Sequence, residues 1–213
     1  MPVADEKKYL RSILKRTRDS IAPGVAAELS ARIQAAFLSA DFYRHSRADD
    51  VPIVLYSALG NEVSTETILD DALASGRAVF YPRLDCTKNT LSIGRVQSRA
   101  DLIPGAHGVL EPKTSPFDLS SMPRSIVVVP GVAFTARGTR LGRGGGHYDR
   151  LLAELSPQAI KVGLAYSFQL LDDIPLLGWD QQLNFVVTES AIYPAPEAAW
   201  RDLGVRPQGG IPR

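Results

Sequence analysis

Arg140-Leu-Gly-Arg-Gly-Gly-Gly-His-Tyr-Asp149 is the most informative stretch of this chain, and it follows the apolar run Ile126-Val-Val-Val129. The apolar run has the composition of a buried strand, Pro130-Gly131 ends it, and a helical pattern begins at Tyr148. The glycines therefore fall in a connection from a strand to a helix. This arrangement is typical of an α/β domain.

The glycine-rich connection is suited to bind a polyphosphate. Because the triplet Gly144–Gly146 has no Cβ atoms, we expect its backbone to adopt positive φ angles and to bring several N–H donors close to one anion. The N-terminus of the following helix adds partial positive charge. Arg140 and Arg143 can grip phosphate oxygens, and Asp149 is a hard oxygen ligand for the Mg²⁺ that accompanies nucleotide phosphates.

Two familiar glycine motifs do not describe this loop. It lacks the Gly-Lys-Ser/Thr ending of a Walker A loop, and it fits the dinucleotide fingerprint G-x-G-x-x-G only by accident. A flexible surface linker is the alternative, because most glycine clusters have no other function. Two arginines and an aspartate beside a hydrophobic strand favour phosphate binding over that alternative.

The rest of the sequence alternates between helical and β-rich segments, as is typical of an α/β protein. Apolar residues at helical spacing predict a pair of helices over about residues 5–40, joined at Pro23-Gly24. From residue 51 on, short β-rich runs alternate with helical or loop segments, at 53–56, 78–81, 126–129, 161–164 and 185–187. Since several runs are wholly apolar, we expect a central, mostly parallel sheet with helices on both faces, a Rossmann-like three-layer sandwich.

Length and composition fit one soluble domain. The chain has 213 residues, of which 45% are hydrophobic and 22% are charged, so residues 1–190 can bury a full core as a single α/β domain. Residues 191–213 hold prolines and glycines with little periodicity, which predicts an irregular tail. The net charge is +1 and the basic residues are dispersed, which argues against a nucleic-acid partner.

Several features predict a cytoplasmic location without a membrane partner. The single cysteine, Cys86, cannot form an intrachain disulfide, as is typical of a reducing compartment. The N-terminal run Asp5-Glu6-Lys7-Lys8 is charged and does not resemble a signal peptide. No apolar segment is long enough to cross a bilayer.

A series of motifs in a fixed order points to a known family. The longest is Pro130-Gly-Val-Ala-Phe-Thr-Ala-Arg-Gly-Thr-Arg-Leu-Gly-Arg-Gly-Gly-Gly-His-Tyr-Asp-Arg150. Shorter ones are Lys7-Lys-Tyr-Leu-Arg11, Glu62-Val-Ser-Thr65, Tyr81-Pro-Arg83, Gly108-Val-Leu-Glu111-Pro112, Trp179-Asp180 and Val186-Val-Thr188. In this order, over about residues 7–189, they resemble the 5-formyltetrahydrofolate cyclo-ligase family, also called the 5,10-methenyltetrahydrofolate synthetases.

The resemblance implies an ATP- and Mg²⁺-dependent cyclisation of 5-formyltetrahydrofolate to 5,10-methenyltetrahydrofolate, with release of ADP and phosphate. The formyl group is an amide and resists attack, so transfer of the γ-phosphoryl group to its oxygen would create a leaving group. Nitrogen 10 of the folate would then attack the activated carbon. Such a reaction needs adjoining sites for MgATP and the pterin, lined by fixed cations and N–H donors.

The resemblance also implies roles for individual residues. The implied ATP contacts are Lys7, Arg11, Arg140, Leu141, Gly142, Arg143, Gly144, Gly145, Gly146, His147 and Tyr148. The implied folate contacts are Ser57, Glu62, Arg143, Gly144, Gly145, Gly146 and His147. Arg140, Arg143 and Tyr148 are implied in catalysis, and Asp149 and Asp180 are implied as the Mg²⁺ ligands.

Some of these residues have a plain structural alternative. Lys7 and Arg11 are four apart on one helical face, which fits an anion contact but also an ordinary solvated face. Glu62 can accept two parallel hydrogen bonds from a pterin, or it can be a turn acid ahead of a helix capped by Thr65. Asp180 by itself resembles a loop acid after Trp179.

The chain departs from the family pattern at two positions. His147 stands where the family often has a second aromatic residue, and an imidazole there can stack, hydrogen-bond or titrate near neutral pH. Asn184 stands where the family usually has a second aspartate, which puts a metal-binding or charge-balancing role of that position in doubt.

The sequence leaves two alternative functions open. One is a non-catalytic folate- or nucleotide-binding protein that keeps the fold, and the retained set of charged residues argues against it. The other is an unrelated nucleotide-using sugar or phosphate enzyme. Glu62 and Glu111 argue against that rival, because an enzyme that binds only phosphates needs neither.

Overall fold

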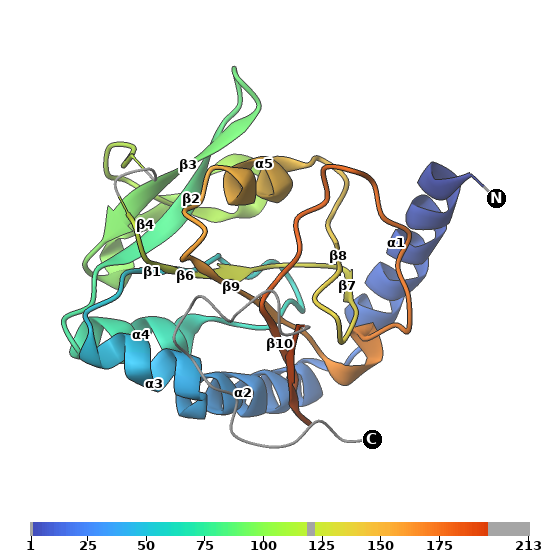
Figure 1. Ribbon diagram of the computed structural model, residues 1–213, viewed down its shortest axis with the longest axis horizontal. Helices are drawn as coiled ribbons and strands as arrows, with labels where there is room; N and C mark the ends of the chain where they lie inside the picture. Colours follow the sequence, from blue (N-terminus) through green and yellow to red (C-terminus); the bar gives the residue numbers. More distant parts are fainter. Residues whose placement is uncertain (1, 119–121, 196–213) are drawn as a thin grey trace.

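A seven-stranded sheet runs through the centre of the protein in the computed structural model, which describes residues 2–118 and 122–195 (Figure 1). The strand order is β11-β10-β9-β6-β1-β2-β3. These strands are β1 (Ile53–Val54), β2 (Val79–Asp85), β3 (Thr90–Val96), β6 (Ile126–Val129), β9 (Ile160–Leu164), β10 (Phe185–Val187) and β11 (Ile192–Pro194). The strands from β10 to β2 are parallel, and the edge strands β11 and β3 are antiparallel to their neighbours. The predicted mostly parallel sheet is confirmed.

The sheet buries apolar side chains on both faces. Along β6, Ile126 and Val128 belong to one core cluster, whereas Val127 and Val129 belong to another. Successive side chains of a strand point to opposite faces, so a strand that is covered on both faces is apolar at every position. The first face is covered by α2 (Pro23–Ser39), α3 (Asp41–Ala48) and α4 (Glu66–Ala74), and the second by α5 (His147–Ala153), as Figure 1 shows. The predicted three-layer sandwich is confirmed.

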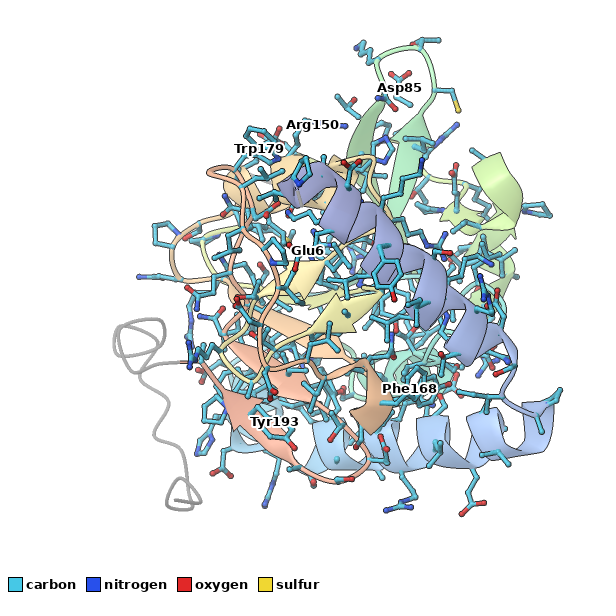
Figure 2. All side chains as sticks on the ribbon, turned by 90° about the vertical axis from the view of Figure 1, so that its right-hand side faces the viewer. Glu6, Asp85, Arg150, Phe168, Trp179 and Tyr193 are labelled. Atoms are coloured by element: carbon cyan, nitrogen blue, oxygen red, sulfur yellow. The ribbon has the colours of Figure 1, made fainter. Side chains whose placement is uncertain are left out.

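The N-terminal helix α1 (Val3–Asp19) lies apart from these layers, along the side of the molecule that faces the viewer in Figure 2. Its Leu14 packs with Ala133 and Leu141. These two residues belong to a hairpin of β7 (Ala133–Phe134) and β8 (Arg140–Leu141). The helices α1 and α2 correspond to the predicted helical pair, and α3 is an addition to it. No helix in the described part of the chain is long and apolar enough to cross a membrane.

Several short elements extend the predicted pattern. The hairpin of β7 and β8 is inserted in the connection between β6 and α5. The antiparallel pair β4 (Leu102–Pro104) and β5 (Leu110–Pro112) forms a separate ribbon. The short 3-10 helices are η1 (Arg99–Asp101), η2 (Ala106–Gly108) and η4 (Ser167–Gln169).

The predicted tail begins too early. Residues 192–194 form β11, whose register pairs Phe185 with Pro194 and Val187 with Ile192. The backbone N–H of Ala195 also donates to the carbonyl oxygen of Asn184 at 2.8 Å. These backbone hydrogen bonds need no apolar periodicity, which explains why sequence pattern alone misses the strand. The rest of the predicted tail, 196–213, lies outside the described residues.

Thr65 occupies the N-cap position of α4 but does not cap the helix with its side chain. Its Oγ1 instead donates to the carbonyl oxygen of Tyr56 at 2.7 Å. The first N–H groups of the helix find other acceptors, since Ser64 Oγ accepts from Glu66 N and Gln34 Oε1 accepts from Thr67 N. Thr65 thus fastens the start of α4 to the chain just after β1.

Candidate functional site

A cavity of about 570 Å³ lies at the carboxyl ends of β1, β2 and β6. Its walls include Tyr56-Ser57 after β1, Pro82 and Leu84 in β2, and Pro130-Gly131 after β6. The sheet extends in one direction from β1 to β3 and in the other from β6 to β11. The cavity therefore lies at the switch point between β1 and β6, which is where open α/β sheets bind their ligands.

Every residue to which the family resemblance gives a role lines this one cavity. The residues are Lys7 and Arg11 of α1, Ser57 and Glu62 after β1, Arg140 and Leu141 of β8, Gly142 to Gly146 of the following loop, His147, Tyr148 and Asp149 of α5, and Asp180. The fold thus brings together segments as far apart in sequence as Lys7 and Asp180, which form an ion pair. Their proximity is shown, and the role of each remains a prediction.

The glycine loop has positive φ angles at two of its three glycines. Gly144 has φ 109° and Gly146 has φ 65°, so both need the freedom of glycine. The expectation for Gly145 is wrong, because Gly145 does not have a positive φ. A Cβ on Gly145 would instead lie 2.7 Å from Cε1 and Nδ1 of His147. A side chain at position 145 would therefore displace the imidazole ring of His147 from its place against the loop, whereas the backbone conformation of Gly145 does not demand glycine.

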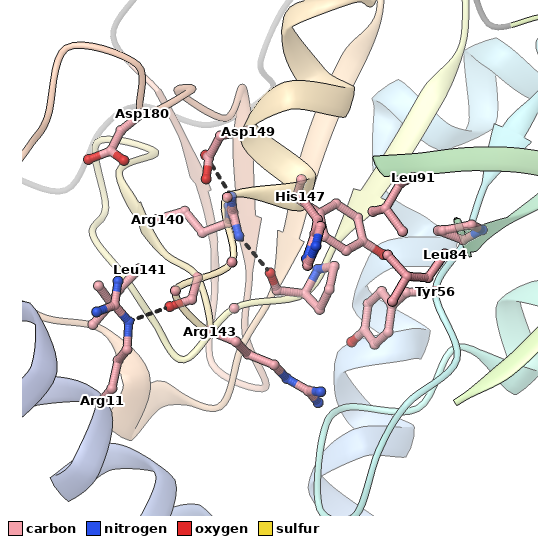
Figure 3. Close-up of a pocket in the computed structure, with 18 of the residues that line it drawn as sticks. Arg11, Tyr56, Leu84, Leu91, Arg140, Leu141, Arg143, His147, Asp149 and Asp180 are labelled. Atoms are coloured by element: carbon pink, nitrogen blue, oxygen red, sulfur yellow. Dashed lines mark hydrogen bonds and ion pairs between the residues drawn. The ribbon is translucent and has the colours of Figure 1, made fainter. Parts of the chain in front are cut away.

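The helix α1 forms one wall of the cavity. Nε of Arg11 donates to the carbonyl oxygen of Gly142 at 2.8 Å and so fastens the helix to the glycine loop (Figure 3). Lys7 is only 4% exposed and pairs with Asp180. The alternative of an ordinary solvated helix face is therefore wrong for these two cations.

The two predicted metal-binding carboxylates lie on the same side of the cavity (Figure 3). Asp149 Oδ1 accepts from Arg140 Nη2 at 2.7 Å and from Gln181 N at 3.4 Å. Asp180 Oδ2 accepts from Lys7 Nζ and from Leu177 N. Neither Asp149 Oδ2 nor Asp180 Oδ1 accepts a hydrogen bond from the residues that the structure describes. Each carboxylate thus keeps one oxygen for a further ligand.

These carboxylates form a pair and not a larger cluster. Within residues 2–118 and 122–195 there is no group of three or more His, Cys, Asp or Glu side chains that could hold a metal ion. Mg²⁺ does not need such a group, because it usually binds to one or two carboxylates together with water and substrate phosphates. The side chains of Asp149 and Asp180 are 16% and 12% exposed, so they fit a cation that arrives with a nucleotide.

Arg140 and Arg143, to which the sequence gives the same expected role, have different surroundings. The side chain of Arg140 is 3% exposed, and its Nη1 and Nη2 donate to the carbonyl oxygen of Pro130 and to Asp149. The side chain of Arg143 is 47% exposed and reaches away from the two aspartates, with Nη2 donating to Glu62 Oε1 at 2.6 Å. Arg140 is therefore held in place by Pro130 and Asp149, whereas the more exposed Arg143 is free to change its orientation.

Glu62 is a buried carboxylate, and not an exposed turn acid. Its side chain is 5% exposed, and Oε2 accepts from the backbone N–H of Leu59 at 3.1 Å. Oε1 accepts from Arg143 and also from Nη1 of Arg18 at 3.3 Å. Sequence reasoning missed Arg18, although its spacing of seven residues from Arg11 places both on one face of α1.

Burial controls the protonation of the tyrosines around the cavity. Burial, together with the negative charge of Glu62, raises the pKa of Tyr148 well above its ordinary value, and burial does the same for the pKa of Tyr56. Both phenols therefore stay protonated at neutral pH and can donate hydrogen bonds, but they cannot act as bases. Tyr56 already donates to the carbonyl oxygen of Val63 at 2.6 Å, and Ser57 Oγ donates to that of Leu110 at 2.7 Å.

The two departures from the family pattern have different surroundings. Nε2 of His147 lies 2.7 Å from Oδ1 of Asn89, at the turn between β2 and β3, and Arg150 also donates to the backbone of Asn89. His147 therefore joins the glycine loop to that turn. Asn184 does not line the cavity, and its Oδ1 accepts from the backbone N–H of Lys161 at 2.7 Å. The side chain of Asn184 thus hydrogen-bonds to β9 of the central sheet and not to the cavity.

Comparison with known proteins gives one consistent result. A profile of the 5-formyltetrahydrofolate cyclo-ligase family matches residues 3–189. The mitochondrial 5-formyltetrahydrofolate cyclo-ligase of Arabidopsis thaliana is 26% identical over 93% of this chain and 79% of its own length. The 5-formyltetrahydrofolate cyclo-ligase of Escherichia coli K12 is 28% identical over 66% of this chain and 79% of its own length. The solved structure of Aquifex aeolicus 5,10-methenyltetrahydrofolate synthetase is 28% identical, covers 96% of each chain and has a TM-score of 0.76.

Proposed function

The chain belongs to the 5-formyltetrahydrofolate cyclo-ligase family, and from that premise we propose that it uses ATP to cyclise 5-formyltetrahydrofolate to 5,10-methenyltetrahydrofolate. The observation that carries the proposal is the single cavity that holds the glycine loop, the two aspartates and the buried Glu62. The reaction requires a phosphate site and a pterin site side by side, because the γ-phosphoryl group must reach the formyl oxygen.

The proposed chemistry has two steps. The formyl oxygen attacks the γ-phosphorus, an O–P bond forms, the bond to the β,γ-bridging oxygen breaks, and ADP leaves. Nitrogen 10 then attacks the formyl carbon, the C–O bond breaks, and phosphate leaves with the formyl oxygen while the proton of nitrogen 10 passes to solvent. No side-chain nucleophile is needed, so positioning and charge stabilisation supply the catalysis.

The phosphate side of the proposed site is built from the loop and α1. Gly144 and Gly146 allow the backbone N–H groups to approach phosphate oxygens, and Lys7, Arg11 and Arg143 supply positive charge. The oxygens of Asp149 and Asp180 that accept no hydrogen bond in the described part of the chain are the ones that would hold Mg²⁺. A bound Mg²⁺ would neutralise charge on the β- and γ-phosphates.

The pterin side of the proposed site centres on Glu62. Its carboxylate can accept two parallel hydrogen bonds from a ring N–H and an amino group of the pterin. Arg143 occupies Oε1 of that carboxylate in the ligand-free protein. The pterin therefore replaces Arg143 at Glu62, and this replacement frees the guanidinium for the phosphoryl oxygens. Tyr148 lines the same cavity and stays protonated, so it would be able to donate a hydrogen bond to a substrate oxygen.

A spectroscopic assay tests this proposal. Methenyltetrahydrofolate absorbs at longer wavelength than 5-formyltetrahydrofolate, so its absorbance should rise when the protein, 5-formyltetrahydrofolate and MgATP are mixed. No rise is expected when MgATP is left out. Binding of both substrates without any rise would favour the rival function of a non-catalytic binding protein.

Gly144→Ala is expected to weaken MgATP binding by about 1–2 kcal/mol, roughly 5- to 30-fold, because a side chain is strained at a positive φ. A Cβ at this position would make no close contact, since its nearest neighbour is Arg11 Cζ at 3.6 Å. Backbone conformation is thus the only property that the substitution changes. Calorimetric titration with MgATP measures the effect, and Gly24→Ala, at an open position of α2, is the control. Unchanged nucleotide affinity would mean that the loop is only a linker.

Asp149→Asn is expected to raise the Mg²⁺ concentration needed for activity several-fold, because a neutral amide is a poorer ligand for a hard dication. The affinity for 5-formyltetrahydrofolate should change little. Mg²⁺ titrations of activity at fixed ATP measure the first quantity, and calorimetry measures the second. Asp173→Asn, at an exposed position outside the cavity, is the control. An unchanged Mg²⁺ requirement with weaker folate binding would contradict the metal-binding role of Asp149.

The compartment is a separate proposal. The cytoplasm is the proposed location, because a single cysteine is typical of a protein from a reducing compartment. One relative of the chain is described as mitochondrial, so membership in the family does not fix the compartment. The proposed partners are 5-formyltetrahydrofolate and MgATP, and a net charge of +1 gives no support for a nucleic-acid partner.

A further inference from the structure

Arg18 is a buried cation to which the proposed mechanism gives no role. It lies in the last turn of α1, its side chain is 6% exposed, and its Nη1 donates to Glu62 Oε1 at 3.3 Å. Its Nε is buried without a hydrogen-bond partner among the described residues. Burial of a guanidinium carries a desolvation cost, and the carboxylate that offsets this cost for Arg18 is Glu62.

The end of α1 is fixed beside this carboxylate. Nδ2 of Asn61 donates to the carbonyl oxygens of Arg18 at 3.1 Å and Ile21 at 2.9 Å. Asn61 directly precedes Glu62, so these hydrogen bonds hold the helix end and the Glu62 loop together. The backbone N–H of Leu59 holds Oε2 of Glu62 from the loop side. Arg18 and Leu59 thus fix one oxygen each.

Two cations share Oε1 of Glu62 but differ in exposure. The side chain of Arg143 is 47% exposed and comes from the glycine loop, whereas that of Arg18 is 6% exposed. An exposed arginine can move into solvent at low cost, but a buried one cannot. Arg143 is therefore the exchangeable counter-ion, and Arg18 is the one that stays when a ligand takes the place of Arg143.

A buried carboxylate with no counter-ion is unfavourable. Such a group turns away toward solvent when nothing holds it. A displaced Glu62 would no longer present two acceptors to the pterin edge. The cation that remains on Glu62 therefore decides whether the pterin can be recognised.

We propose that Arg18 is a positioning residue for substrate binding, which balances the charge of the Glu62 carboxylate and holds its orientation while the pterin replaces Arg143. The inference rests on the proposed role of Glu62 as the pterin acceptor. One face of α1 then serves both parts of the proposed site. Lys7 and Arg11 face the phosphate side of the cavity, and Arg18 supports Glu62 on the pterin side.

Arg18→Met tests the proposal, because it removes the charge and keeps much of the side-chain volume. The KM for 5-formyltetrahydrofolate should rise about tenfold or more, since a buried pair is broken. The KM for ATP and kcat should change little, because neither depends on Glu62 in the proposed mechanism. Arg18→Lys, which keeps a cation, should restore most of the folate affinity. Arg16→Met, at an exposed position in the same turn, is the control and should behave like the wild type.

A double-mutant cycle connects the effect to the carboxylate. In a Glu62→Gln background there is no negative charge for Arg18 to balance, so Arg18→Met should cause little further loss of folate binding. Three results would overturn the proposal: equal increases of both KM values, full additivity in the cycle, or a loss in Arg18→Lys as large as that in Arg18→Met.

The folding of the variants gives a second test. If Arg18→Met does not fold, the double variant Arg18→Met/Glu62→Gln, in which both buried charges are removed, should fold and bind ATP. A double variant that also failed to fold would overturn the proposal, since Arg18 would then support something other than Glu62. A wild-type protein that bound ATP but not 5-formyltetrahydrofolate would instead contradict the proposed function itself.

Discussion

Arg143→Ala is expected to reduce kcat roughly 30- to 1,000-fold while the protein stays folded. The guanidinium is exposed and lies on the glycine loop, so its loss leaves the core intact. The transition state, in contrast, loses one fixed cation from the phosphoryl oxygens. Removal of one such donor costs about 2–4 kcal/mol of barrier. Steady-state turnover under saturating MgATP and folate measures this quantity.

The same variant is expected to have a different effect on folate affinity than on turnover. Because Arg143 occupies Glu62 in the ligand-free protein, its removal should leave folate affinity in the absence of nucleotide unchanged or tighter. Arg124→Ala is a matched control, since the Arg124 side chain is 48% exposed and also forms one ion pair. Turnover within a few-fold of the wild type would contradict the catalytic role of Arg143. Weaker folate binding without nucleotide would contradict the exchange at Glu62.

Glu62→Gln is expected to weaken 5-formyltetrahydrofolate binding about tenfold or more, because a charge-assisted contact worth about 1.5–3 kcal/mol is lost and a donor then faces a donor. ATP affinity should change far less, since the phosphates contact the loop and α1. Calorimetric titration of each ligand into the variant and the wild type measures both effects.

Glu66→Gln provides the matched control for this prediction. Glu66 also pairs with an arginine, but its side chain is 70% exposed, so its neutralisation should affect neither ligand. Equal weakening of both ligands in Glu62→Gln would indicate a folding defect. Unchanged folate affinity would mean that Glu62 only holds the two arginines in place.

The sequence predicts the centre of the fold well, because the central strands are covered on both faces. The run Ile126–Val129 has to be apolar throughout to fill two core clusters, and such a run is easy to recognise. The short hairpin of β7 and β8 and the ribbon of β4 and β5 contain only two or three residues per strand. They are too short for any period to emerge, so their backbone pairing is seen only in three dimensions.

The candidate site, like the fold, can be predicted only in part from the sequence. Motif order predicts which residues meet, since the residues that were given roles line one cavity. Sequence pattern does not predict their surroundings, because burial and pairing arise from segments far apart in the chain. Arg140 and Arg143 differ in exposure, and the ring of His147 lies where a Cβ of residue 145 would be. The buried contact between Arg18 and Glu62 spans 44 residues, so the helical spacing that places Arg18 beside Arg11 does not reveal its partner.

Transfer of an oxygen isotope shows whether phosphorylation of the formyl oxygen drives ring closure in this cavity. The wild-type protein is supplied with MgATP and with 5-formyltetrahydrofolate that carries ¹⁸O in the formyl group, and the released phosphate is analysed by mass spectrometry. The account predicts that the ¹⁸O appears in the phosphate, in step with the formation of methenyltetrahydrofolate. Methenyltetrahydrofolate formed together with unlabelled phosphate would contradict it.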